Sequence, residues 1–76
     1  MSSQRSRLRF IRALDAETRG DVRRWASTDS VAKRIGLEYE EAEALAAELE
    51  VVGLLRIGGG HSVWLTHEGR QPVKKR

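Results

Sequence analysis

The stretch Ser27-Thr-Asp-Ser-Val-Ala-Lys-Arg-Ile-Gly-Leu37 has the pattern of a short helix followed by a tight turn. Ser27 or Thr28 supplies a hydroxyl that can cap the helix by accepting from an amide of the first turn. Three apolar residues recur at helical spacing and form one stripe, Val31, Ala32 and Ile35. Gly36 ends the helix, because glycine adopts the left-handed conformation of a helix end at low cost.

Amphipathic helices are predicted on both sides of this stretch. Upstream, apolar residues alternate with arginines at helical spacing and predict a first helix that ends near residues 15–18; they are Leu8, Phe10, Ile11 and Leu14. Downstream, a third helix runs from Tyr39 or Glu40 to Val52, with Gly53 as its end. Its buried stripe is Ala42, Leu45, Ala46, Leu49 and Val52. The segment 22–26 fits either a short strand or a loop that Trp25 anchors against the core.

A hairpin follows the third helix. Strands are predicted at Leu54–Ile57 and Ser62–Leu65, joined by Gly58-Gly-Gly-His61, because β-branched and aromatic residues on either side of a glycine run indicate a hairpin. Thr66 is expected to be a cap or turn residue. Residues 1–4 and the tail from Gln71 are expected to be disordered. The prediction is one domain over residues 1–76, ordered from about 5 to 70, with a basic tail at 71–76.

The predicted order is helix, optional short strand, helix, turn, helix and hairpin, so the fold class is α+β and mostly α. In this order, three segments resemble the winged helix-turn-helix family of bacterial and archaeal transcription regulators. Residues 27–37 resemble its positioning helix and turn, residues 41–55 its recognition helix, and residues 56–70 its wing with a closing Leu-Thr-x-x-Gly. The resemblance implies three helices followed by a two-stranded wing, with the third helix in a DNA major groove.

The charge distribution bears on that expectation. The net charge is +3, but residues 38–50 hold six glutamates and no Lys or Arg, which leaves +9 on the remaining residues. DNA is contacted mostly through basic and amide side chains, and carboxylates repel phosphate. We interpret the glutamates as a solvated helix surface, those of the first turn being favoured by the helix dipole. DNA contacts are therefore expected from the wing, the second helix and the basic flanks.

Candidate contacts lie on those three parts of the chain. Lys33 and Arg34 are expected on the second helix where the family places it across the DNA backbone, and Arg56 on a wing whose glycine amides can approach phosphate closely. The full candidate set is Arg23, Arg24, Lys33, Arg34, Tyr39, Arg56 and His61. For each single residue, a solvated surface is the alternative. The aromatic residues Phe10, Trp25, Tyr39 and Trp64 are expected in the core or at its edge, and an exposed Trp64 would mark a partner surface.

Several classes of function are disfavoured. The chain has no cysteine, and His61 and His67 lack a helical ligand spacing or a third ligand, so no metal site is expected. No nucleophile or phosphate-loop motif occurs, so we expect neither an enzyme nor a cofactor. No apolar run approaches the roughly 20 residues of a membrane span, and no secretory signal is evident. A cytoplasmic location is expected.

Two functions remain. The first is a small transcription regulator that binds double-stranded DNA as a homodimer. The second is a protein-interaction module whose acidic third helix faces a basic partner. The arrangement of charge discriminates between them: Lys33, Arg34, Arg56 and the N-terminal arginines on one face favour nucleic acid. A glutamate face flanked by exposed apolar residues favours a protein.

Overall fold

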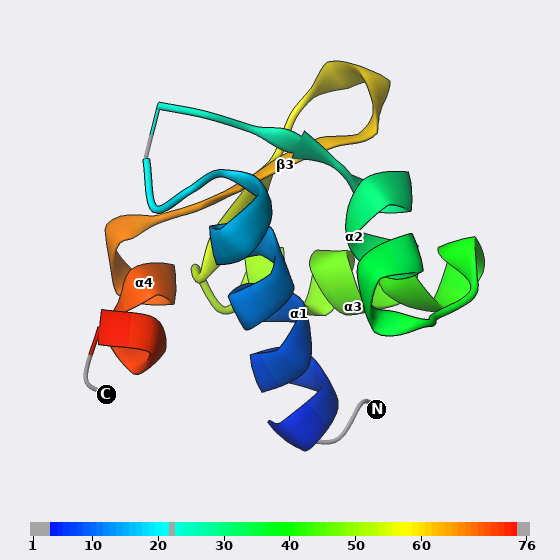
Figure 1. Cartoon of the computed structure of the whole chain (residues 1–76), viewed down its shortest axis with the longest axis horizontal. Coiled ribbons are helices and arrows are strands. Elements are labelled where there is room, and N and C mark those ends of the chain that lie inside the picture. Colours follow the sequence, from blue (N-terminus) through cyan, green and yellow to red (C-terminus); the bar gives the residue numbers. More distant parts are fainter. Residues whose placement is uncertain (1–3, 22, 75–76) are drawn as a thin grey trace.

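The structure is a computed structural model that describes residues 4–21 and 23–74 (Figure 1). Its elements are α1 (Gln4–Glu17), β1 (Ala26–Ser27), α2 (Thr28–Ile35), α3 (Tyr39–Val51), β2 (Leu55–Ile57), a 3-10 turn η1 (Gly59–His61), β3 (Ser62–Leu65) and α4 (His67–Lys74). In Figure 1, α2 and α3 lie on one side of α1 and α4 lies on the other. The described residues therefore form an α+β, mostly helical structure, as expected.

Helix α4 was not predicted, and the sequence left open whether a short strand precedes α2. The expectation of three helices and a two-stranded hairpin is wrong in number, because the described residues form four α-helices and a three-stranded antiparallel sheet. Two residues of β1 are too few to show a period, and α4 occupies positions expected to be a turn and a disordered tail as far as Lys74. Gln4 already belongs to α1. The expectations for residues 1–3, Val22 and residues 75–76 lie outside the described residues. The order of elements is compatible with a winged-helix arrangement.

The sheet has β3 at its centre, in the order β1-β3-β2. Ala26 lies opposite Val63 in one ladder, and Arg56 lies opposite Trp64 in the other. Because side chains alternate along a strand, one face points to the helices and the other to solvent. The inner face is Ala26, Leu55, Val63 and Leu65, all buried. The outer face carries Ser27, Arg56, Ser62 and Trp64.

The core lies between this inner face and the helices. Most residues of the stripes predicted from helical spacing are buried, with Phe10 and Leu14 of α1, Val31 of α2, and Leu49 of α3 fully inaccessible. Leu8 and Ile35 are half-buried. Val52 is exposed, with 57% of the residue accessible, because α3 ends at Val51 and Val52 is its cap.

The caps of α2 follow the sequence pattern. The Ser27 hydroxyl accepts from the amide of Ser30 at 3.1 Å, so Ser27 rather than Thr28 is the cap. Gly36 adopts φ 71°, and the amide of Leu37 donates to the carbonyl of Ala32 at 2.9 Å. This geometry turns the chain from α2 into α3 within a few residues, and it explains why a glycine stands at position 36.

The junction between β3 and α4 explains the Leu-Thr-x-x-Gly motif. The Thr66 hydroxyl accepts from the amide of Gly69 at 3.1 Å and donates to the carbonyl of Gly53 at 2.7 Å. A Cβ on Gly69 would collide with the carbonyl oxygen of Leu54, and it would lie 3.1 Å from a methyl of Leu65. Thr66 therefore caps α4, as expected, and the bare backbone of Gly69 lets α4 rest on the turn between α3 and β2.

A buried ion pair joins α4 to α1. The Arg70 side chain is only 4% exposed, and its Nη1 lies 2.8 Å from Oδ1 of Asp15. Removing an arginine from water is costly unless a carboxylate faces it, so this pair fixes how α4 docks rather than adding much stability by itself. The sequence offered no periodic signal for it, because the partners are 55 residues apart.

We predict that Gly69→Ala destabilises the protein by about 1–3 kcal/mol, because the added methyl overpacks the contact with Leu54. Alanine ordinarily stabilises a helix relative to glycine by about 1 kcal/mol, so the expected sign is reversed at this site. Urea unfolding followed by circular dichroism measures the effect. Gly59→Ala is the matched control, because nothing lies within 4 Å of a Cβ at Gly59. Equal stability of the two variants would contradict the close packing of α4.

A second prediction concerns the ion pair between Asp15 and Arg70. Asp15→Ala leaves the guanidinium buried without its carboxylate and should cost about 3 kcal/mol of unfolding free energy. Glu17→Ala on the same helix removes an exposed pair with Arg34 and should cost less than about 1 kcal/mol. Denaturant titration of both variants tests the contrast. A loss in Asp15→Ala no larger than that in Glu17→Ala would show that α4 does not depend on the pair.

Candidate nucleic-acid interface

The outer face of the sheet presents an arginine beside a tryptophan. Arg56 on β2 lies directly opposite Trp64 on β3. The Trp64 ring packs over Gly58, since a Cβ on that glycine would lie 2.8 Å from the ring atom Cζ3. Within the part of the chain that the structure describes, the Arg56 side chain makes no ion pair. The wing therefore holds an aromatic ring in place next to an exposed, uncompensated cation.

Trp25 extends this face on the side of β1. It directly precedes β1, whose first residue, Ala26, is buried in the core. The residue is 63% exposed, so the expectation that it packs in the core or at its edge is wrong. Phe10, by contrast, is buried as expected, and Trp64 and Tyr39 are half-buried. Tryptophan suits either environment, which is why composition could not place Trp25.

Two further arginines stand just before Trp25. Arg23 and Arg24 share one carboxylate, with Nε to Asp21 oxygen distances of 3.3 Å and 4.0 Å. The backbone amide and the guanidinium of Arg23 lower the pKa of Asp21, and the charge of Arg24 adds to that effect. Two cations on one carboxylate leave a net positive charge at this end of the sheet. Both side chains are mostly exposed, as a contact to an external anion requires.

The candidates on α2 are already paired within the chain. Nζ of Lys33 lies 3.3 Å from Asp29 on the same helix, and Nε of Arg34 lies 2.8 Å from Glu17 on α1. Exposed pairs of this kind are weak and can be exchanged for an external phosphate. Nevertheless, their partners lower the local positive charge. The structure thus leaves exposed arginines before β1, at Arg23 and Arg24, and on β2, at Arg56, whereas Lys33 and Arg34 make contacts of α2.

The last two candidates meet at the tip of the wing. The rings of Tyr39 and His61 are 5.7 Å apart in an edge-to-face arrangement, and Nδ1 of His61 lies 3.5 Å from Glu43. The Tyr39 hydroxyl donates to the same carboxylate at 3.4 Å, and the Thr28 hydroxyl donates to the carbonyl of His61 at 3.0 Å. These contacts fasten the wing tip to the starts of α2 and α3. Glu43 is a partner that sequence reasoning missed, because it was assigned to a solvated surface.

The exposed surface of α3 is acidic. Its exposed carboxylates are Glu38 at the cap and Glu40, Glu41, Glu43 and Glu50 along the helix. Glu48 is half-buried and pairs with Arg7 of α1 at 3.1 Å, and Glu50 accepts from the amide of Ile57 at 3.0 Å. In a DNA groove these carboxylates would face phosphates of the same sign. This helix is therefore poorly suited to reading a major groove.

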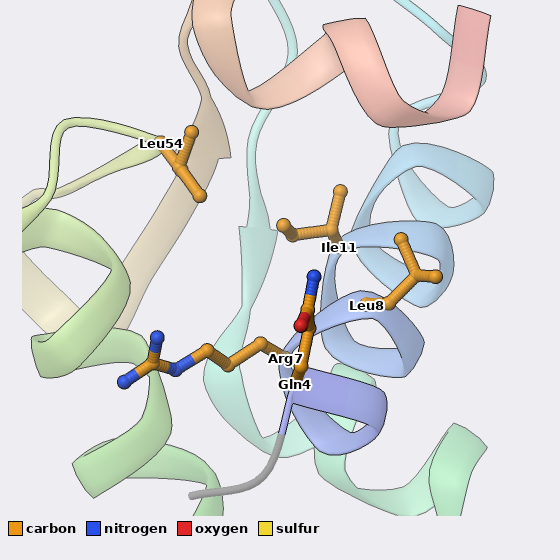
Figure 2. A pocket seen from close by; sticks show the side chains of 5 residues that line it. All are labelled: Gln4, Arg7, Leu8, Ile11 and Leu54. Atoms are coloured by element: carbon orange, nitrogen blue, oxygen red, sulfur yellow. The ribbon is translucent and has the colours of Figure 1, made fainter. Parts of the chain in front are cut away.

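A small hollow lies elsewhere, between α1 and the turn after α3 (Figure 2). Its volume is about 230 Å³, and its lining is Gln4, Arg7, Leu8, Ile11 and Leu54. In Figure 2 the Arg7 side chain extends across to α3, where Glu48 binds it. None of the predicted contact residues lines this hollow. Across residues 4–21 and 23–74, no group of three or more His, Asp or Glu side chains is placed to hold a metal ion.

The Tyr39 contact yields a spectroscopic prediction. Loss of hydration, the charge of Glu43 and the hydrogen bond to it all raise the pKa of Tyr39 above its ordinary value of 10.0. The neutral phenol is thus favoured in the folded state, so the contact stabilises the fold below the ordinary pKa and is lost as pH rises through the raised one. Tyr39 is the sole tyrosine of the chain, so an ultraviolet titration reports it alone.

Glu43→Gln should lower the midpoint of this titration, because it removes the negative charge beside the phenol. Glu41→Gln, on the same helix turn but without a contact to Tyr39, is the control and should leave the midpoint unchanged. A midpoint at the ordinary value in the unsubstituted protein would show that Tyr39 does not contact Glu43 in solution.

Comparison with known proteins does not indicate a function for this chain. No helix of the described residues is long and apolar enough to cross a lipid bilayer. No family model, no curated protein and no solved structure matches this chain.

Proposed function

We propose that this protein is a small winged-helix transcription regulator that binds double-stranded DNA through the wing and the outer face of the sheet. The observation that carries the proposal is the separation of charge. Exposed arginines surround the sheet, at residues 23, 24 and 56, whereas exposed glutamates cover α3. A polyanion meets attraction on the first surface and repulsion on the second.

The order of the elements supports this proposal. A helix, a tight turn and a second helix precede a hairpin, and the hairpin leads into the capped Thr66-x-x-Gly69 junction. In winged-helix proteins this arrangement binds DNA with the second helix of the pair and the wing. Because the exposed surface of α3 is acidic, we infer that the wing and the residues beside it make the DNA contacts. Fold alone does not establish a function, so the exposed arginines are the main support for this proposal.

Phosphate contacts on this face would be few and salt-dependent. Arg56 can pair with one phosphate, and Arg23 and Arg24 can reach another stretch of the same backbone once they release Asp21. Each phosphate neutralised contributes about −0.9 to the slope of log K against log salt, so three contacts per copy predict a slope of about −3 for each copy bound. Two copies on one duplex would double the contacts, and we therefore propose that the protein binds as a homodimer.

A second candidate function is recognition of a basic protein by α3. It is favoured by two valines at the end of the acidic helix, since Val51 is 86% exposed and Val52 is 57% exposed. Apolar side chains beside a row of carboxylates suit a partner that is both apolar and positively charged. A titration with duplex DNA separates the two candidates, because recognition of a basic protein by α3 predicts no duplex binding.

The test is fluorescence anisotropy of a labelled random-sequence duplex at low and moderate salt. We expect binding at low salt with the slope given above. Arg23→Ala combined with Arg56→Ala should weaken binding about tenfold and reduce the magnitude of the slope by about two, because each lost contact removes about 0.9 from it. Lys33→Ala, which opens an existing pair on α2, should have a smaller effect.

Glu41→Ala is the matched control for the arginine variants. It lies on the exposed surface of α3, and its removal should leave duplex affinity unchanged or slightly raised. Absence of duplex binding even at low salt would refute the proposed function. Weaker binding in Glu41→Ala than in the arginine variants would instead place the duplex on α3.

A further inference from the structure

The outer face of the sheet exposes more aromatic surface than a phosphate contact needs. Trp25 is 63% exposed, and Trp64 is only half-buried. A large ring left in water is informative when it lies beside another one, because scattered apolar residues are ordinary on a protein surface. Trp64 lies on the outer face of β3, and Trp25 directly precedes β1, the strand that pairs with β3.

The two tryptophans lie near the same end of the β1–β3 ladder. Ala26, the first residue of β1, lies opposite Val63, so Trp25 directly precedes this pair and Trp64 directly follows it along the chain. Arg56 lies opposite Trp64 on the other side. We call Trp25, Trp64 and Arg56 the row at this end of the sheet. Gly58 leaves the space in which the Trp64 ring lies, and alanine at that position would take it.

The positive charge beside this row indicates which kind of partner can bind to it. The strands of the sheet contain no acidic residue, and Asp21 at the β1 end is outnumbered by Arg23 and Arg24. A second copy of the chain docked face to face would bring arginines against arginines, which is unfavourable. The fitting partner is negatively charged and also offers flat apolar groups to the indole rings.

We propose that the row of Trp25, Trp64 and Arg56 binds single-stranded nucleic acid, with bases stacked on the two indole rings and phosphates paired with the arginines. The proposal deepens the proposed function and rests on the same nucleic-acid-binding face. A duplex hides its base faces within its own stack, whereas unpaired bases present them. Stacking on aromatic side chains of a sheet is a general way of binding such bases without sequence preference.

The experiment uses the natural fluorescence of the intact chain. Trp25 and Trp64 are its only tryptophans, so a change in indole emission reports this face alone. The probes are a short oligo(dT), an oligo(rU) of the same length, a random-sequence duplex and vesicles of anionic phospholipid. We expect quenching by oligo(dT), by oligo(rU) or by both, and the comparison of the two shows which sugar is preferred.

Trp25 provides a matched pair of variants, because it is exposed and its substitution leaves the buried core residues unchanged. Trp25→Leu keeps an apolar side chain but removes the aromatic ring, and it should weaken single-strand binding about tenfold, the effect expected for one lost stacking contact. Trp25→Phe retains a ring and should restore most of the affinity. Duplex affinity should change by less than about threefold in both, since duplex binding relies on the arginines.

Each result bears on one proposal or the other. Equal single-strand affinity of Trp25→Leu and the unsubstituted protein would overturn the stacking site, as would quenching by vesicles without quenching by either oligonucleotide. Single-strand binding that depends on Trp25, in a protein that does not bind duplex, would support the stacking site and refute the proposed regulator. Duplex binding that depends on Arg56, without any effect of Trp25, would do the reverse.

Discussion

The pairing of β3 with both β1 and β2 is the constraint on which the rest of the structure depends. Val63 and Leu65 bury the inner side of this strand against the helices, and their neighbours in sequence, Ser62 and Trp64, must then face solvent. The same strand brings residue 26 beside residue 63, and so joins the start of α2 to the wing. The buried and the exposed side chains of β3 thus follow from one strand register. A slip of the register by a single residue would turn the buried side chains outward and the exposed ones inward.

Two kinds of contact hold the helices together around this sheet: close approach of the backbone at a glycine, and a buried ion pair. Gly69 lets α4 approach the carbonyl of Leu54, and Arg70 on the next position reaches Asp15 of α1. A chain of this size buries only roughly 60% of its unfolded surface, so a few such contacts contribute a large share of its stability. Helix α4 therefore closes the core, although its sequence has little apolar character.

Electrostatics divide the surface into two parts. Glutamates on α3 are partly used inside the molecule, since Glu43 holds the wing tip, Glu48 holds Arg7 and Glu50 covers the amide of Ile57. The last contact shields part of an edge strand, which limits pairing with other chains. Arginines on the sheet side have fewer internal partners. This asymmetry favours binding of a polyanion by the sheet and wing over insertion of α3 into a groove.

The sequence alone determined helices α1 to α3 and the hairpin, because these depend on spacing and on residues that act over three or four positions. The stripes of α1 to α3, a hydroxyl cap at Ser27 or Thr28 and the glycine end at Gly36 follow from such local rules. Of the candidate contacts, Arg23, Arg24 and Arg56 are exposed, but sequence could not show that Lys33 and Arg34 are paired with Asp29 and Glu17.

Only the tertiary structure decided the strand at Ala26–Ser27, helix α4 and the exposure of Trp25. A two-residue strand has no period of its own and exists because β3 offers it partners. The row of Trp25, Trp64 and Arg56 combines three segments that are distant in sequence, so no local pattern could predict it. The pairing of β3 with β1 and β2 brings these segments together, and this pairing is a property of the folded sheet.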